Sequence, residues 1–183
     1  MFQLRYKYLI ATIFVLLFIS SCSEKQADII NTKIYEVAHL SFSYPANWEV
    51  TEDIENEGVR FLFIESPGDA IIKVEVYDNG ESFDLKEFVR LDIDAFKQEV
   101  PSILNLAEGK ITPISRQYNQ KEFNGYRYEF NISIANIDIP HVSDFFISVS
   151  PKKTAYITNQ VAIEDLGKVS SGFKLVLSSF KLQ

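Results

Sequence analysis

The feature that most restricts the fold is a run of alternating side chains near the middle of the chain. In "YRYEFNISI", Tyr126–Ile134, apolar residues occupy every second position and polar residues occupy the positions between them. Successive side chains of a β-strand point to opposite faces, so this run predicts a strand whose sheet has one buried face. The preceding Asn124-Gly125 is a strong turn signal and predicts a hairpin with a strand over residues 114–121.

Other stretches also predict antiparallel strands. Residues 59–65 and 70–77 are strand-like runs joined by "SPGD", in which proline and glycine favour a turn. Residues 143–150 and 154–160 form another predicted hairpin, joined by Pro151-Lys152-Lys153. Near the N-terminus, alternation in "LSFSY" places Leu40, Phe42 and Tyr44 on one face. A sheet built from such hairpins is mostly antiparallel.

Two segments predict helices, and with the strands they indicate an α+β domain whose sheet is covered by helices. Residues 84–100 open with Asp84 and Glu87 in a capping-box arrangement. The apolar face of this segment contains Leu85, Phe88, Val89, Ala95, Phe96 and Val100. The second helix is predicted from about Glu164 to Leu177, and its glycines, Gly167 and Gly172, should make it the less stable one.

The order of these elements resembles the PsbP-like family. The matching residues are Phe42, Pro45 and Trp48, in F-x-x-P-x-x-W, and the closing Ser179-Phe180-Lys181. The resemblance covers residues 34–182 and implies an αβα sandwich around a mostly antiparallel sheet. Family members include extrinsic photosystem subunits, a nuclear-transport cofactor and bacterial envelope lipoproteins. The resemblance implies a protein that acts by binding other proteins, not an enzyme, and it transfers no site residue.

The N-terminus has the pattern of a bacterial lipoprotein precursor. Arg5 and Lys7 precede an apolar run, Leu9–Ile19, which has the length of a signal-peptide core and is too short for a membrane-spanning helix. "ISSC", which ends at Cys22, resembles the lipoprotein box and implies cleavage before Cys22 and lipidation of its thiol. The alternative is an ordinary secretory signal with an incidental cysteine.

The predicted organisation is therefore a signal peptide over residues 1–21, a lipidated cysteine and tether over residues 22–32, and a domain over residues 33–183. Several acyl chains give stable anchoring, so the expected partner is the membrane through Cys22. Ser23 stands where an aspartate favours inner-membrane retention. This favours the periplasmic face of the outer membrane if the cell is Gram-negative.

Charge and residue counts exclude several classes of function. A net charge of −7 argues against a nucleic-acid partner, because phosphates are bound mainly by basic groups. The only cysteine is Cys22, and the two histidines, His39 and His141, share no ligand motif, so neither a metal nor another cofactor is expected. "GKVSSGFK", residues 167–174, lacks a lysine directly after its second glycine and is not a phosphate loop.

Two polar segments are predicted to be solvated loops. "DIPHVSD", residues 138–144, contains Asp138, His141, Ser143 and Asp144, but the members of a catalytic triad normally come from separate segments. "EDIENE", residues 52–57, lacks the ligand spacing and glycine of a calcium loop. Neither segment is expected to be a catalytic or metal site.

Trp48 and Asp92 are the candidate pocket or partner contacts. Trp48 is predicted to cover the core beside the sheet, and the alternative is an exposed contact for a partner. Asp92 falls within the apolar arc of the first helix, between Phe88 and Phe96. One interpretation is that Asp92 bonds a tyrosine hydroxyl, an arginine or a backbone amide. The other is that it lines a polar-tipped pocket.

These observations predict a lipid-anchored binding or accessory module that docks on, or stabilises, another envelope protein. The alternative is a carrier of a small hydrophobic ligand, held between the sheet and the helix over residues 84–100. A hydrolase that uses surface carboxylates is a third class. An exposed apolar patch would favour docking, an enclosed apolar pocket a carrier, and convergent titratable groups in a cleft an enzyme.

Overall fold

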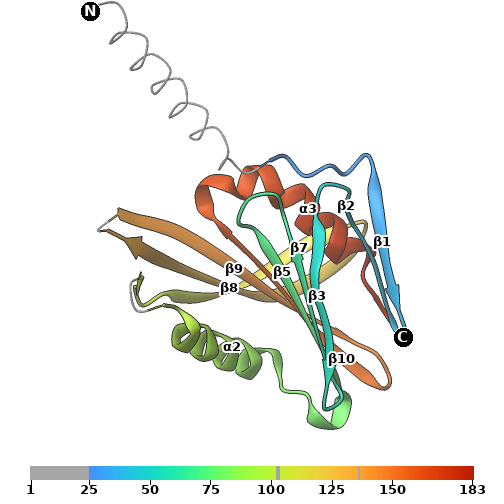
Figure 1. The fold of residues 1–183 in the computed structure, drawn as a ribbon. Helices are drawn as coiled ribbons and strands as arrows, with labels where there is room; N and C mark the ends of the chain where they lie inside the picture. The colour runs from blue at the N-terminus through green and yellow to red at the C-terminus, as the bar shows by residue number, and fades with distance from the viewer. Residues whose placement is uncertain (1–24, 102–103, 136) are drawn as a thin grey trace, which may run out of the picture.

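The computed structural model describes residues 25–101, 104–135 and 137–183 (Figure 1). The predicted signal peptide over residues 1–21 and the predicted lipid-attachment residue Cys22 lie outside the described residues. Among the described residues, no helix is long and apolar enough to cross a membrane.

Two antiparallel sheets form the framework. The larger sheet has eight strands, and β6 and β7 both pair with its last long strand, β8. Its order is β3 (Glu49–Asn56), β4 (Val59–Glu65), β5 (Ile71–Asp78), β10 (Lys153–Ala162), β9 (Ile137–Val149), β8 (Lys121–Ile134) and β6 (Asn105–Leu106), with β7 (Lys110–Tyr118) beside β8. The smaller sheet contains β1 (Thr32–Val37), β2 (Leu40–Pro45) and β11 (Lys181–Leu182).

The two long helices lie on opposite sides of the larger sheet (Figure 1). Helix α2 (Leu85–Glu99) follows the short turn η1 (Asn79–Glu81), and α3 (Leu166–Ser179) follows η2 (Ile163–Asp165). The side chain of Asp84 accepts a hydrogen bond of 2.9 Å from the backbone N–H of Glu87, which caps α2 as predicted. The smaller sheet lies on the same side as α3. The α+β class and the mostly antiparallel sheet are confirmed.

The α3 side of the sheet is packed around the only tryptophan. Trp48 is 1% exposed, and its ring contacts the Phe173 ring edge-on at 5.6 Å between centroids. Gly172 lets α3 approach this ring, because a Cβ there would lie 2.6 Å from the indole. The structure thus places Trp48 in the core, where a partner does not reach it, and gives Gly172 a packing role that its weak helix propensity does not suggest.

The α2 side is packed mainly by aromatic rings. The rings of Phe88 and Tyr156 stack at 3.8 Å between centroids, and Phe96 meets Phe130 edge-on. Ile93 is also buried, whereas Ala95, which was expected on the apolar face of this helix, is exposed. The buried face of α2 keeps Phe88 and Val89 from the predicted face and adds Ile93 in place of Ala95.

The predicted turn at Asn124-Gly125 is wrong. The turn between β7 and β8 lies at Asn119 and Gln120, whose φ angles of 48° and 65° are those of a two-residue hairpin turn. Gly125 instead lies inside β8, where a Cβ would come 2.1 Å from the backbone oxygen of Phe145. The glycine is required by a close approach between strands, not by a turn.

The two predicted solvated loops are strands. Residues 138–144 belong to β9, in the interior of the sheet, and residues 52–56 belong to β3, at its edge. The acidic side chains of β3 suit an exposed edge, because charge discourages pairing with another chain. Two of them, Asp53 and Glu55, bind Arg60 on β4 at 2.5 and 2.6 Å.

Part of the predicted tether is docked on the domain. Ala27 is buried and its N–H donates to the backbone oxygen of Lys168 at 3.0 Å. The N–H of Asp28 donates to the side chain of Asn47 at 2.8 Å. Ala27 and Asp28, which belong to the predicted tether, therefore pack against the domain.

Candidate functional site

A cavity of about 460 Å³ lies between α2 and the larger sheet. Most of its lining is apolar, and a few charged or hydroxyl-bearing side chains lie among the aromatic ones. The lining residues are Phe61, Phe63, Ile71, Lys73, Glu75, Tyr77, Phe83, Phe88, Leu91, Asp92, Ala95, Phe96, Glu99, Thr158 and Gln160. Helix α2 packs on β8, β9 and β10 and covers β4 and β5 less fully. The cavity is the space left between α2 and these two strands, and we identify it as the candidate binding site.

The register of three neighbouring strands builds the floor of the cavity. Lys73 on β5 lies opposite Phe63 on β4 and opposite Thr158 on β10. Glu75 lies opposite Phe61 in the same way. Directly opposed residues share one face of a sheet, so strand pairing alone places these side chains together beneath α2.

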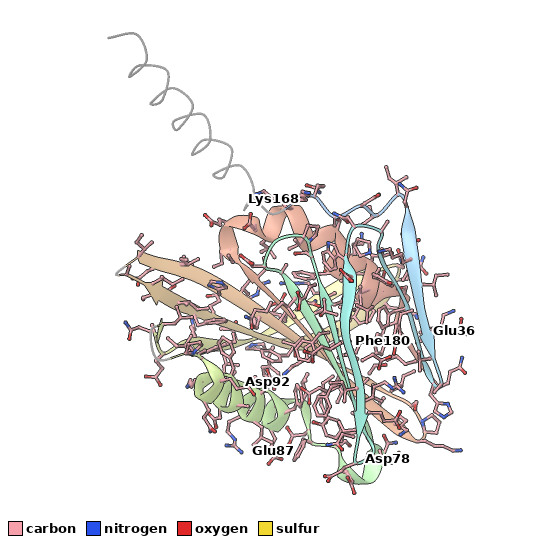
Figure 2. The ribbon with its side chains drawn as sticks, viewed as in Figure 1. Glu36, Asp78, Glu87, Asp92, Lys168 and Phe180 are labelled. Carbon is pink, nitrogen blue, oxygen red and sulfur yellow. The ribbon has the colours of Figure 1, made fainter. Side chains whose placement is uncertain are left out.

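A charged cluster joins the helix to this floor. The Nζ atom of Lys73 binds Oδ1 of Asp92, and it lies 2.9 Å from Oε1 of Glu75. The hydroxyl of Tyr77 donates to Oε2 of Glu75 at 2.6 Å. The side chains of Lys73, Asp92 and Glu75 are only 23%, 13% and 9% exposed, respectively. Figure 2 shows Asp92 on the side of α2 that faces the sheet, and Glu87 on the opposite side.

Burial and the charges of neighbouring groups both act on the ionisation of the cluster. Burial raises the pKa of the Asp92 carboxyl above its usual value, although the Lys73 ammonium acts in the opposite direction; Glu75 and Glu99 add to the increase. For Lys73, burial opposes the charged form, but Asp92 and Glu75 outweigh it and raise its pKa. Burial, and then the hydrogen bond to Glu75, raise the pKa of Tyr77. For the Asp92 carboxyl, the Lys73 ammonium therefore does not fully offset burial and the two neighbouring glutamates.

Thr158 adds a buried hydroxyl to the cavity. Its side chain lines the cavity, the residue is 5% exposed, and Oγ1 has no hydrogen-bond partner among the described residues. Buried hydroxyl groups usually have a partner, because leaving one unpaired costs free energy. A ligand in the cavity could supply that partner.

Each of the two interpretations predicted for Asp92 is partly correct. Asp92 does have a partner and does line a cavity, but the partner is a lysine and not a tyrosine, an arginine or a backbone amide. Lys73, Glu75 and Thr158 were not identified from the sequence. The signal for two of them is present, since Lys73 and Glu75 are polar residues at alternate positions of an otherwise apolar run.

The four polar residues of β9 do not converge. Asp144 binds Arg127 through two hydrogen bonds of 2.6 and 2.8 Å, on the α3 side of the sheet. Ser143, on the other side, donates to Gln160 at 3.2 Å. Nδ1 of His141 lies 2.9 Å from the backbone oxygen of Ile139 on the same strand. Among the described residues, no group of three or more acidic, histidine or cysteine side chains could hold a metal ion.

Comparisons with known proteins identify the fold and not a family. No protein-family model matches the sequence, and no curated protein matches it. The structure is similar to the solution structure of cyanobacterial PsbP (CyanoP) from Synechocystis, with a TM-score of 0.55 and 14% identity, over 85% of this chain and 94% of that one.

Two further structures are more distant. LpqN of Mycobacterium tuberculosis, a protein involved in cell envelope biogenesis, gives a TM-score of 0.49 and 9% identity, over 84% of this chain and 92% of LpqN. A protein of Bacteroides thetaiotaomicron gives 0.47 and 10%, and the match covers 88% of this chain but only 49% of that protein. The element order, the antiparallel sheet between two helices and the similarity to CyanoP establish that the chain has a PsbP-like fold.

Proposed function

We propose that the chain is a lipid-anchored binding module of the cell envelope that holds a small amphipathic ligand between α2 and the sheet. The observation that carries this proposal is the cavity beneath α2. Ligand sites typically have volumes of about 300–1,000 Å³ and apolar or aromatic walls with a few placed polar groups. The cavity has a volume of about 460 Å³ and this kind of lining.

The cluster in the cavity supports binding rather than catalysis. A general acid or base has to reach the proton that it transfers. Both oxygens of Glu75 already accept hydrogen bonds, from Lys73 and from Tyr77, and one oxygen of Asp92 is held by Lys73. We therefore propose that the chain is not an enzyme and that these groups position a ligand.

The docked N-terminal segment supports a position close to a membrane. If Cys22 is lipidated, five peptide steps separate it from the buried Ala27, and an extended chain covers about 18 Å in five residues. The domain would then lie against the bilayer surface and not at the end of a long tether. Labelling with a palmitate analogue tests the anchor: Cys22→Ala should abolish the label, and a variant that retains it would exclude lipidation at this residue.

A second candidate function is docking on another envelope protein, and the observation that favours it is an apolar strand end. Ile134 on β8 lies opposite Ile137 on β9, and they are 45% and 66% exposed. These strand ends project beyond α2 (Figure 1). If they contact a partner, Ile134→Ser with Ile137→Ser should remove crosslinks in intact envelope. Ile111→Ser, at another exposed isoleucine, should not.

The principal proposal is tested by recovering the ligand. The full-length protein is purified from the membrane fraction, and bound apolar molecules are extracted and identified by mass spectrometry. Ala95→Trp should fill the cavity from the exposed side of its lining and reduce the recovered ligand. Glu87→Trp, on the far side of α2, is the matched control. Equal recovery from both variants would contradict the proposal.

A further inference from the structure

We infer that the cavity beneath α2 selects ligands with a protonated amine head and rejects ligands with a carboxylate head. This inference rests on the proposed function and names the ligand class of the same site. It depends on the charges in the lining, on one hydroxyl group and on the aromatic wall.

The charged residues in the lining do not balance. They are one lysine, Lys73, and three carboxylates, Glu75, Asp92 and Glu99, so their formal charges leave a net charge of −2. The Lys73–Asp92 pair alone would join the helix to the sheet. Glu75 adds a second carboxylate to the same ammonium group, and Tyr77 holds it in place. Glu99 is exposed, whereas Glu75 and Asp92 are mostly buried beside a single ammonium group, so the unbalanced charge of these two carboxylates is the one that a counter-charge would stabilise most.

A cationic head has acceptors within this lining. Oδ2 of Asp92 accepts no hydrogen bond from the described residues, whereas Oδ1 binds Lys73. Glu99 lies seven residues after Asp92, two turns along the same face of α2, and also lines the cavity. The pKa of Asp92 is raised partly by Glu99, which indicates that the two carboxylates interact electrostatically. Seven residues span about 10 Å of helix, so an ammonium group bound to Asp92 on the side of Glu99 would reduce that repulsion without contacting both carboxylates.

Thr158 is an independent indication of a ligand. The residue lines the cavity, and its hydroxyl is buried and has no partner among the described residues. It lies on β10 directly opposite Lys73. A hydroxyl can accept a hydrogen bond from an ammonium group as well as donate one. A carboxylate head could use this hydroxyl too, but it would meet the negative charge of the lining.

The wall opposite the helix suits an apolar or aromatic body. Phe61 and Phe63 are half-buried on β4, beside Glu75 and Lys73. Phe83 and Phe88 close the end of the cavity near the start of α2. Aromatic faces also attract cations, so this wall favours the same head group as the carboxylates.

Three soluble probes, each a phenyl ring on a four-carbon chain, test the inference: phenylbutylamine, phenylbutanol and phenylbutyrate, whose fourth carbon is the carboxylate carbon. Binding to the full-length protein in nanodiscs is measured by calorimetry, with empty nanodiscs as the blank. We expect the amine to bind at least about tenfold more tightly than the carboxylate, which corresponds to about 1.4 kcal/mol, and the alcohol to fall between them.

The charge variants separate this inference from the proposed function. Glu99→Gln removes a lining carboxylate without breaking the Lys73 pair and should reduce the preference for the amine several-fold. Asp94→Asn makes the same charge change at a residue that binds Arg90 outside the cavity, and should not. Equal or tighter binding of phenylbutyrate would overturn the inference but leave the site intact. No binding of any probe would contradict both.

Discussion

The two faces of the larger sheet differ, and a single strand shows the difference. Along β5, Ile72, Val74 and Val76 point to the α3 side and are buried in one continuous core. Their neighbours Ile71, Lys73, Glu75 and Tyr77 point to the α2 side and line the cavity. The α3 face is closed by a helix and a second sheet, whereas the α2 face is only partly covered (Figure 1). We infer that one face provides stability and the other provides the binding site.

The largest effect should come from the closed face. Trp48→Ala removes a fully buried indole that packs on Phe173 and Gly172, and should lower the free energy of unfolding by about 3–5 kcal/mol. Urea denaturation followed by circular dichroism measures this change. Phe61→Ala, in the half-buried wall of the cavity, is the comparison and should cost far less. Equal losses would remove the distinction between the faces.

Adjacent residues of β5 give a sharper test. Ile72 is 0% exposed on the α3 side, so Ile72→Ala should cost about 2–5 kcal/mol. Ile71 is only half-buried at the cavity, so Ile71→Ala should cost about 1 kcal/mol. The same denaturation measurement applies to both. If Ile71→Ala were the more damaging change, the assignment of faces would be wrong.

Lys73→Met should show an intermediate, pH-dependent loss. The substitution leaves Glu75 and Asp92 without their cation and should lower the free energy of unfolding by about 1–3 kcal/mol at neutral pH. The loss is smaller than for a fully buried ion pair because Lys73 is partly exposed. Without Lys73 the pKa of Asp92 should rise further above its unfolded value. A raised carboxyl pKa makes stability fall as pH rises through the interval between the unfolded and folded pKa values.

The loss caused by Lys73→Met should therefore be smallest at acid pH and increase as the carboxylates ionise. NMR titration of Asp92 and denaturation at several pH values measure both effects. Adding Asp92→Asn to Lys73→Met should recover part of the stability. A loss that is independent of pH would show that Lys73 acts through packing alone.

Thr158→Val should have a small effect of the opposite sign. It replaces an unpaired buried hydroxyl with a methyl group of similar shape, and should raise the free energy of unfolding by about 1 kcal/mol. Thr154→Val on the same strand is the matched control. The Thr154 hydroxyl donates to Asn79 at 2.8 Å, so its loss should be destabilising. Destabilisation by Thr158→Val would indicate that its hydroxyl is already paired within the protein.

Side-chain periodicity predicted the main elements of this molecule. The alternation over Tyr126–Ile134 is indeed a strand, and capping by Asp84 correctly gave the start of α2. The errors arose where tertiary contacts outweighed local signals. Gly125 was assigned to a turn because glycine favours turns, but its role is a close approach to the neighbouring strand. The polar residues of β9 were assigned to a loop, because their partners come from distant segments.

The candidate site was only partly predictable. Helical phase placed Asp92 among apolar residues, which correctly indicated a buried carboxylate that needs a partner. Its partner Lys73 precedes it by 19 residues on a strand, and helical phase does not define which strand lies beneath the helix. Thr158 comes from a third segment, and only the strand register places it beside Lys73.

The central claim is that a ligand binds on the α2 face and leaves the α3 face unchanged. The most direct measurement is a ¹⁵N NMR titration of the protein with phenylbutylamine. We expect amide shifts at Ile71–Tyr77, α2 and Thr158, with no change at Trp48, Val169 or Phe173. Shifts centred on α3, or saturable binding without shifts around Lys73 and Asp92, would contradict the account.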